Sequence, residues 1–250
     1  MIMNRFILIS IFSIFIILFS CQQIMNEGEA FSKNNSGLEY LNNGQIDEAI
    51  DAFRDASKLS SSKDFKTNYL RNLAVAFHEI NRLDSSRLYF FTAATLNKEN
   101  SMDYLINMAD VNLIDGEVLK AISKLEKAIE NGGEGLQTFN SLGLIYYGHY
   151  GLEYQNLDKA IKFNKKAYEI NKDRITEDLL ARTYYEADIL DKAEHHFMKL
   201  NNTYSDFLDY YYYLGLIKHK TGYIEEGKYI LNMVVQKDSL YYYGIEGILN

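Results

Sequence analysis

The chain has 250 residues, of which 47% are hydrophobic and 24% are charged, so it can bury a core and is not a disordered acidic tail. Its formal net charge of −8 argues against nucleic-acid binding, because that function needs a basic face that displaces phosphate counterions. Proline is absent, which suits a chain that is helical almost throughout.

The first element is an apolar stretch at residues 6–19, which follows Arg5 and precedes a cysteine. As a helix it spans roughly 21 Å, less than the roughly 30 Å hydrocarbon core of a bilayer, so a signal-peptide core is favoured over a transmembrane helix. The sequence Leu18-Phe19-Ser20-Cys21 resembles the lipobox of bacterial lipoproteins. The resemblance implies a signal peptide at 1–20, cleavage before Cys21, lipidation of Cys21 and anchoring in a membrane.

Cys21 is the only cysteine, so the chain can form neither an internal disulfide nor a cysteine metal cluster. The alternative to lipidation is a spare thiol at the end of a signal peptide. Several acyl chains, at about 0.8 kcal/mol per buried methylene, give stable anchoring. We therefore predict a lipidated cysteine and polar tether at 21–29 and a location in the bacterial cell envelope, at the outer membrane rather than the inner.

Two amphipathic helical patterns meet across Asn42-Asn43-Gly44, and this arrangement returns five more times along the chain. We expect small residues where the two helices approach and aromatic residues where gaps are filled: Gly37, Ala49 and Ala56, and Tyr40 and Phe53. From residue 30 onward the chain resembles the tetratricopeptide repeat (TPR) family, whose unit of about 34 residues carries small and aromatic positions on both helices.

The resemblance implies an all-α fold, a right-handed α-solenoid of about six TPR-like helix pairs, in which stacked neighbours complete one another's core. The predicted repeats cover residues 30–63, 67–100, 102–135, 136–173, 174–207 and 208–241, followed by a C-terminal tail or cap at 242–250. Turn residues that favour a left-handed conformation are expected within the pairs, at Gly44, Asn81, Gly116 and Gly222.

The fourth repeat begins with Leu142-Gly143 and Tyr146, and its second helix is displaced by a longer connection at 148–155. The glycines of this connection also resemble the Sel1-like variant of the same helical-pair fold. Its loop carries His149, Tyr150 and Tyr154, which we predict to lie at the binding face, because insertions in a solenoid tend to fall on one face. The alternative is a tolerated surface loop without a role.

Catalysis and cofactor binding have no positive sign in the sequence. Adjacent residues of a helix point about 100° apart, so His195-His196 is predicted to lie at the surface rather than to hold a metal ion. The glycines at 132–135 follow a helix and lack a phosphate-loop ending, which indicates a turn between repeats. No Ser-His-Asp or Cys-His set can be argued from spacing. We predict a protein that is not an enzyme and needs no cofactor or metal.

In TPR proteins, positions two, five, nine, twelve and thirteen of the first helix commonly face a concave groove. Counted onto the last three repeats, the resemblance implies these groove residues: Asn140, Leu144, Tyr147, Arg182, Tyr185, Tyr212, Leu216 and His219. Tyr and Arg are enriched at binding hot spots, which favours a partner there. The alternative is that tyrosine, with 21 copies, is simply plentiful and packs between helices.

The predicted function is a lipid-anchored scaffold that binds a protein or peptide partner across repeats four to six. Among bacterial TPR lipoproteins, the chain resembles those that assist outer-membrane protein assembly, pilus-secretin assembly or cell-wall enzyme localisation, and its residues do not choose among them. The second reading is a surface-exposed lipoprotein that binds a peptide, a glycan or a host ligand in a tyrosine-rich groove.

Overall fold

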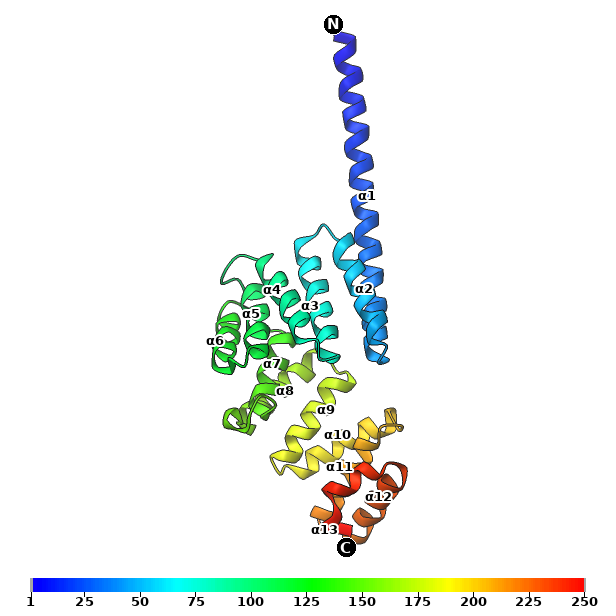
Figure 1. Ribbon diagram of the computed structural model, residues 1–250, viewed down its shortest axis with the longest axis vertical. Coiled ribbons are helices and arrows are strands. Elements are labelled where there is room, and N and C mark those ends of the chain that lie inside the picture. The colour runs from blue at the N-terminus through cyan, green and yellow to red at the C-terminus, as the bar shows by residue number, and fades with distance from the viewer. Residues whose placement is uncertain (1, 250) are drawn as a thin grey trace. The chain divides into compact units, whose positions relative to one another are not determined.

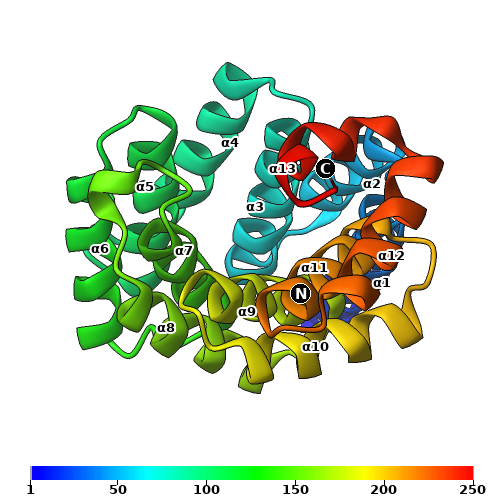
Figure 2. The ribbon, with the colours of Figure 1, turned by 90° about the horizontal axis from the view of Figure 1, so that it is seen from below.

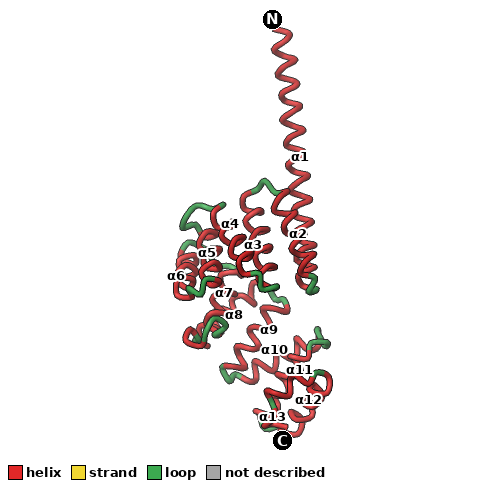
Figure 3. Tube along the Cα trace, in the orientation of Figure 1, coloured by secondary structure: helices red, strands yellow, loops and turns green. Residues whose placement is uncertain are grey.

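The computed structural model describes the backbone of residues 2–249 and the side chains of residues 20–249. The chain divides into two compact bodies, Met1–Gly133 and Glu134–Asn250, here called the N-terminal and C-terminal bodies. Every regular element in the described residues is a helix, as Figure 3 shows, so the all-α prediction is confirmed.

Each body is a stack of helix pairs in which every helix packs against the next one along the chain (Figures 1 and 2). The pairs of the N-terminal body are α1 (Ile2–Asn42) with α2 (Ile46–Leu59), α3 (Lys63–Glu79) with α4 (Leu83–Thr95), and α5 (Met102–Ile114) with α6 (Val118–Glu130). Those of the C-terminal body are α7 (Leu136–Tyr147) with α8 (Leu157–Ile170), α9 (Arg174–Glu186) with α10 (Leu190–Thr203), and α11 (Leu208–Lys220) with α12 (Ile224–Lys237). The described residues thus form six helix pairs, as predicted.

Short helical segments complete the C-terminal body. The 3-10 turn η1 (Leu152–Tyr154) lies in the long connection between α7 and α8. A second 3-10 segment, η2 (Ser239–Gly244), and the short α13 (Glu246–Leu249) follow α12 and pack against it. Ile245, between the two segments, is only 1% exposed, so this end of the chain is part of the packed body.

The turn inside each helix pair contains a residue with positive φ, which reverses the chain direction. Glycine adopts this conformation without a Cβ clash, and short polar side chains tolerate it. The six residues are Gly44, Asn81, Gly116, Gly148, Asp188 and Gly222. The four left-handed turns predicted from the sequence are confirmed. The turn at Asp188 was not predicted, because it contains neither a glycine nor an asparagine.

Four helices, α3, α5, α8 and α9, begin with a side-chain cap. Ser62, Ser101, Asn156 and Asp173 each accept a hydrogen bond from the backbone N–H three residues later. Such a cap satisfies one of the N–H groups that the first turn of a helix leaves without a partner. These helices therefore begin at positions that the local sequence itself specifies.

Small residues allow the helices of a pair to approach closely. A Cβ atom on Gly37 would lie 2.6 Å from Cε1 of Phe53, so only glycine fits at this point of α1. Ala49, Phe53 and Ala56 are fully buried, as expected from their positions in the repeat. Tyr40 is 36% exposed, however, so the prediction that it fills a gap is wrong.

Tyr40 is exposed because the first pair lacks an aromatic stack that covers the corresponding ring in other pairs. Phe77 stacks on Tyr89, Tyr146 on Phe163 and Tyr184 on His196, with ring centroids 5.4, 5.9 and 5.8 Å apart. In the first pair the place corresponding to Tyr89 is taken by Ala52, which offers Tyr40 no ring.

The same stack corrects the prediction for His195-His196. His195 is exposed, whereas the side chain of His196 is only 15% exposed and packs between Tyr184 and Tyr168. Its Nδ1 atom lies 3.1 Å from Oε1 of the buried Glu177. The prediction of a surface position is therefore wrong for His196, because its place in the repeat is the one at which an aromatic ring stacks on the first helix of the pair. The described residues contain no group of three side chains placed to hold a metal ion.

Residues 21–29 were predicted to hold a lipidated cysteine and a polar tether, and the structure shows them as part of α1. Glu27 accepts hydrogen bonds from the backbone N–H groups of Ser61 and Ser62, at 2.5 and 2.7 Å, and from the Ser60 hydroxyl at 2.8 Å. Burial acts to raise the pKa of Glu27, but these hydrogen bonds hold it below its usual value. The tether prediction is wrong because Glu27 fastens this stretch to the loop after α2.

Within residues 20–249, no helix has an apolar stretch long enough to cross a membrane. The signal-peptide prediction concerns residues 1–20, and the side chains of 1–19 lie outside the described residues. Cys21 is exposed on α1. Lipidation of this cysteine stays a prediction.

Candidate functional site

The candidate site lies on the first helices of the three pairs of the C-terminal body, α7, α9 and α11. Four half-buried tyrosines and an arginine with its carboxylate partners gather there, together with the half-buried Tyr241 of η2. We call this group the tyrosine cluster; it consists of Tyr147, Asp178, Arg182, Tyr185, Asp209, Tyr212, Tyr213 and Tyr241.

Four rings of the cluster form a chain of contacts. Tyr185 of α9 and Tyr213 of α11 meet nearly perpendicularly, with centroids 5.1 Å apart. Tyr212 contacts Tyr213 at 5.7 Å and Tyr241 of η2 at 5.2 Å. The first two contacts are edge-to-face, which is favourable because a ring edge is positive and a ring face negative, and the Tyr212–Tyr241 contact is tilted. The last two helix pairs and η2 therefore share one aromatic surface.

Arg182 is the centre of the cluster and is held inside it. Its Nε donates to Oδ1 of Asp178 and its Nη2 donates to Oδ2 of Asp209, both at 2.9 Å. A third nitrogen donates to the Tyr213 hydroxyl at 3.2 Å, and the guanidinium lies 4.8 Å from the centre of that ring. The sequence predicted Arg182 as a residue that contacts a partner. All three of its nitrogens donate to groups of the protein itself, so it fixes the positions of α9 and α11; its contact with a partner stays a prediction.

Tyr147 connects α7 to the same cluster. Burial raises its pKa to about 12, and nearby Tyr213 and Glu186 act in the same direction. Burial also raises the pKa of Tyr185 to about 12. Both hydroxyls therefore keep their protons at neutral pH, and each offers a hydrogen-bond donor at the edge of a large apolar ring.

The two carboxylates of the cluster differ in their surroundings. Burial raises the pKa of Asp178 above its usual value, in spite of the opposing effect of Arg182. Burial acts in the same direction on Asp209, but hydrogen bonds from Tyr241 and Arg182 hold its pKa below the usual value. Asp209 is therefore charged at neutral pH and joins η2 to α9 through its two donors.

Asn140 and His219 were also predicted to face a partner. Both side chains are half-buried, on α7 and α11 respectively. Neither forms a hydrogen bond or an ion pair with another described residue, and no ring contact brings His219 to the tyrosines. The structure thus unites Tyr147, Arg182, Tyr185 and Tyr212, and leaves these two outside the cluster.

The long connection of the fourth pair folds back on the end of α7. Nε2 of Gln155 donates to the Tyr147 carbonyl at 3.1 Å, and the Asn156 N–H donates to the Tyr146 carbonyl at 2.8 Å. His149 is exposed and meets the Tyr150 ring edge-on at 5.0 Å. Tyr154 is half-buried. A role for this loop in binding stays a prediction.

Sequence reasoning missed four members of the cluster: Asp178, Asp209, Tyr213 and Tyr241. One signal for Asp178 was present, because a carboxylate four residues before an arginine lies on the same helix face. Asp209 stands at position two of its repeat, which is also a groove position. Tyr213 and Tyr241 carried no signal, since neither stands at one of the expected positions.

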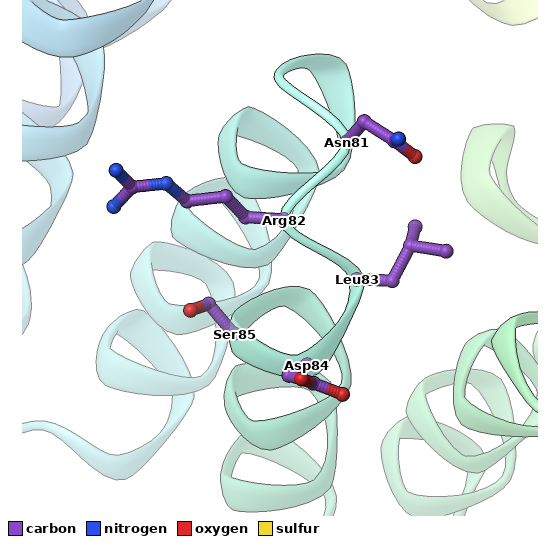
Figure 4. Close-up of a pocket in the computed structure, with 5 residues that line it drawn as sticks. All are labelled: Asn81, Arg82, Leu83, Asp84 and Ser85. Carbon is purple, nitrogen blue, oxygen red and sulfur yellow. The ribbon is translucent and has the colours of Figure 1, made fainter.

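One pocket lies in the N-terminal body, at the turn between α3 and α4. It is lined by five successive residues, Asn81, Arg82, Leu83, Asp84 and Ser85. Figure 4 shows that the Arg82 and Leu83 side chains extend in different directions and do not converge on one point. A site needs groups that converge on a ligand, usually from several elements, so this pocket is not the candidate site.

The stacked helix pairs define an all-α repeat protein. No family model matches the chain. It is 26% identical over 128 residues to the BBSome complex member BBS4 of Bos taurus, a match that covers 50% of this chain and 24% of that protein. The chain thus spans about a quarter of the curated relative that it matches.

Three solved structures resemble the chain at 15–19% sequence identity. The Cut9–Hcn1 hetero-tetramer of the APC/C has a TM-score of 0.66, with 89% of this chain and 43% of that chain covered. PilF of Pseudomonas aeruginosa has a TM-score of 0.57, with 89% and 98% covered. YrrB, described as a TPR protein with an unusual peptide-binding site, has a TM-score of 0.55, with 79% and 99% covered. The fold is that of the tetratricopeptide repeat proteins.

Proposed function

We propose that the protein is an interaction scaffold whose C-terminal body binds a protein or peptide segment through the tyrosine cluster. The observation that carries the proposal is the cluster itself, in which half-buried tyrosines of α9, α11 and η2 are in ring contact and Tyr147 of α7 interacts electrostatically with Tyr213 and Arg182. Tyrosine offers a large contact area and a polar tip at a low cost in side-chain entropy, which is why it is common at binding hot spots.

The comparisons support this class of function. YrrB is described as having a peptide-binding site, BBS4 as a member of a complex, and Cut9 as part of a hetero-tetramer. A solenoid also suits the task, because stacked pairs present an extended surface that no single pair could form. The partner of this chain is left open by these likenesses, since they extend to the fold alone.

The tyrosine cluster is tested by the double change Tyr147→Ala and Tyr185→Ala in the full-length protein. We expect crosslinking in native membranes to lose the partner band, or to need about 10- to 100-fold more protein for the same yield, because two hot-spot rings are removed. The matched control is Tyr223→Ala with Tyr229→Ala, which removes two tyrosines that are 61% and 66% exposed near and on α12. Unchanged crosslinks in a folded cluster variant would contradict the proposal.

We also propose that the scaffold is anchored to the bacterial cell envelope through lipid on Cys21. The lipobox-like sequence and the exposure of this residue support the proposal. Because residues 22–29 are helical, they rise by about 12 Å rather than the roughly 27 Å of an extended chain. The first helix pair would then stand close to the membrane surface.

For the anchor, Cys21→Ala is expected to abolish incorporation of a labelled fatty acid and to release the protein from the membrane fraction or leave its signal peptide uncleaved. The measurement is metabolic labelling combined with fractionation. Ser20→Ala, which keeps a small residue before the cysteine, serves as the control and should be labelled normally. Equal labelling of the Cys21 variant would rule out this anchor.

A further inference from the structure

The tyrosine faces of the cluster already attract cations of the protein itself. The guanidinium of Arg182 lies 4.8 Å from the centre of the Tyr213 ring, and Nζ of Lys220 lies 5.3 Å from that of Tyr185. A cation over the face of an aromatic ring is attracted by the negative charge of the π system. The surface is therefore built to receive positive charge.

The two internal cations are held with very different strength. Arg182 is bound by two carboxylates and is 24% exposed. Lys220 has a single carboxylate partner, Asp188 at 2.8 Å, and the two side chains are 48% and 71% exposed. An exposed ion pair of this kind contributes little to stability. Another cation is thus able to displace Lys220 from Tyr185 at small cost.

Glu186 supplies the negative charge that such a cation would meet. It is exposed at the end of α9, next to Tyr185, and forms no ion pair with any described residue. Its neighbour on α9, Tyr185, is in contact with Tyr213 at 5.1 Å, and the negative charge of Glu186 acts to raise the pKa of Tyr147, Tyr185 and Tyr213. Around the cluster, the positive charges of Arg182 and Lys220 are neutralised by carboxylates, whereas the negative charge of Glu186 is not neutralised by any described cation.

We infer that the partner segment carries a lysine or arginine, which enters among Tyr147, Tyr185 and Tyr213 beside Glu186. This inference rests on the proposed function and names the chemistry of its ligand. The tyrosines would hold the cation and its aliphatic stem, and Glu186 would form the ion pair. An acidic segment does not fit, because it would meet an unpaired carboxylate and find no free cation.

The inference is tested with the full-length protein and short fluorescein-labelled Gly-Ser peptides that have two central lysines, two glutamates or two leucines. Fluorescence anisotropy gives their affinities. We expect the lysine peptide to bind more tightly than the other two, and Glu186→Gln to weaken its binding by about 3- to 10-fold. The control is Glu225→Gln, an equal loss of charge at an exposed position of α12, which should leave binding unchanged.

A second variant separates the ring site from general electrostatic attraction. Lys220→Gln removes the competing cation from Tyr185 and should raise the affinity of the lysine peptide by about 2- to 5-fold. Lys228→Gln makes the same change in charge on α12 and should have a smaller effect. Equal effects of the two lysine variants would overturn the placement of the cation on Tyr185.

The outcomes for the inference and for the proposed function are distinct. If the three peptides bind equally, or if Glu186→Gln leaves the lysine peptide unaffected, the inference of a basic partner is overturned. The proposed function still stands in that case, provided that Tyr147→Ala with Tyr185→Ala removes the native crosslinks. Persistence of those crosslinks contradicts the proposed function itself.

Discussion

Gly143→Leu is expected to destabilise the C-terminal body by about 1–3 kcal/mol, because it overpacks a point where helices nearly touch. A Cβ atom at this position of α7 would lie 1.7 Å from Oδ1 of Asn164 on α8. Asn164 is 1% exposed, and its Nδ2 donates to the Thr183 hydroxyl at 2.8 Å. The amide therefore has little freedom to move away from the new side chain.

The measurement is urea unfolding followed by circular dichroism. Gly28→Leu is the matched control, because a Cβ atom on Gly28 would meet no atom within 4 Å in α1. That change should be neutral or stabilise by about 0.5–1 kcal/mol, since leucine favours a helix more than glycine does. An unchanged unfolding curve for Gly143→Leu would show that the helices are not packed as described.

Arg182→Ala is expected to cost about 2 kcal/mol of stability at neutral pH, because it leaves the carboxylates of Asp178 and Asp209 without their cation. The Arg182 and Asp178 side chains are 24% and 21% exposed, so solvent compensates only part of the loss. The control is Lys165→Ala, which breaks the ion pair between Lys165 and Glu169, two side chains that are 61% and 60% exposed. This change should cost at most about 0.5 kcal/mol of stability.

The loss in Arg182→Ala should shrink as the solution is acidified. Burial already raises the pKa of Asp178, and removal of the arginine raises it further. A carboxyl group whose pKa is higher in the folded state than in the unfolded state gains folding stability as the pH falls through the folded pKa. The deficit relative to the unchanged protein should therefore be smaller at about pH 5 than at about pH 7. A deficit independent of pH would mean that Asp178 is not the destabilised group.

This role of Arg182 also bears on tests of binding. A variant that lacks the arginine would disturb α9 and α11 as well as any contact with a partner. The tyrosines Tyr147 and Tyr185 are better targets, because removing their rings leaves the ion pairs of Arg182 with Asp178 and Asp209 in place.

The sequence by itself determined the repeat. Positive-φ turns were predicted at Gly44 and Gly222 because glycine adopts them without a clash, and burial of Phe53 followed from its place in the repeated pattern. Such features depend on residues close together in the chain, so their spacing is visible in one sequence.

The tertiary structure decided which side chains meet across neighbouring helices. Arg182 was assigned to a partner because its position in the repeat commonly faces the groove, but Asp209 of the next pair forms an ion pair with it. In the same way, Ser60, Ser61 and Ser62 donate hydrogen bonds to Glu27, so the segment that was expected to be a tether packs as part of α1. Each contact joins residues far apart in the chain, and its strength depends on burial and distance, which periodicity does not encode.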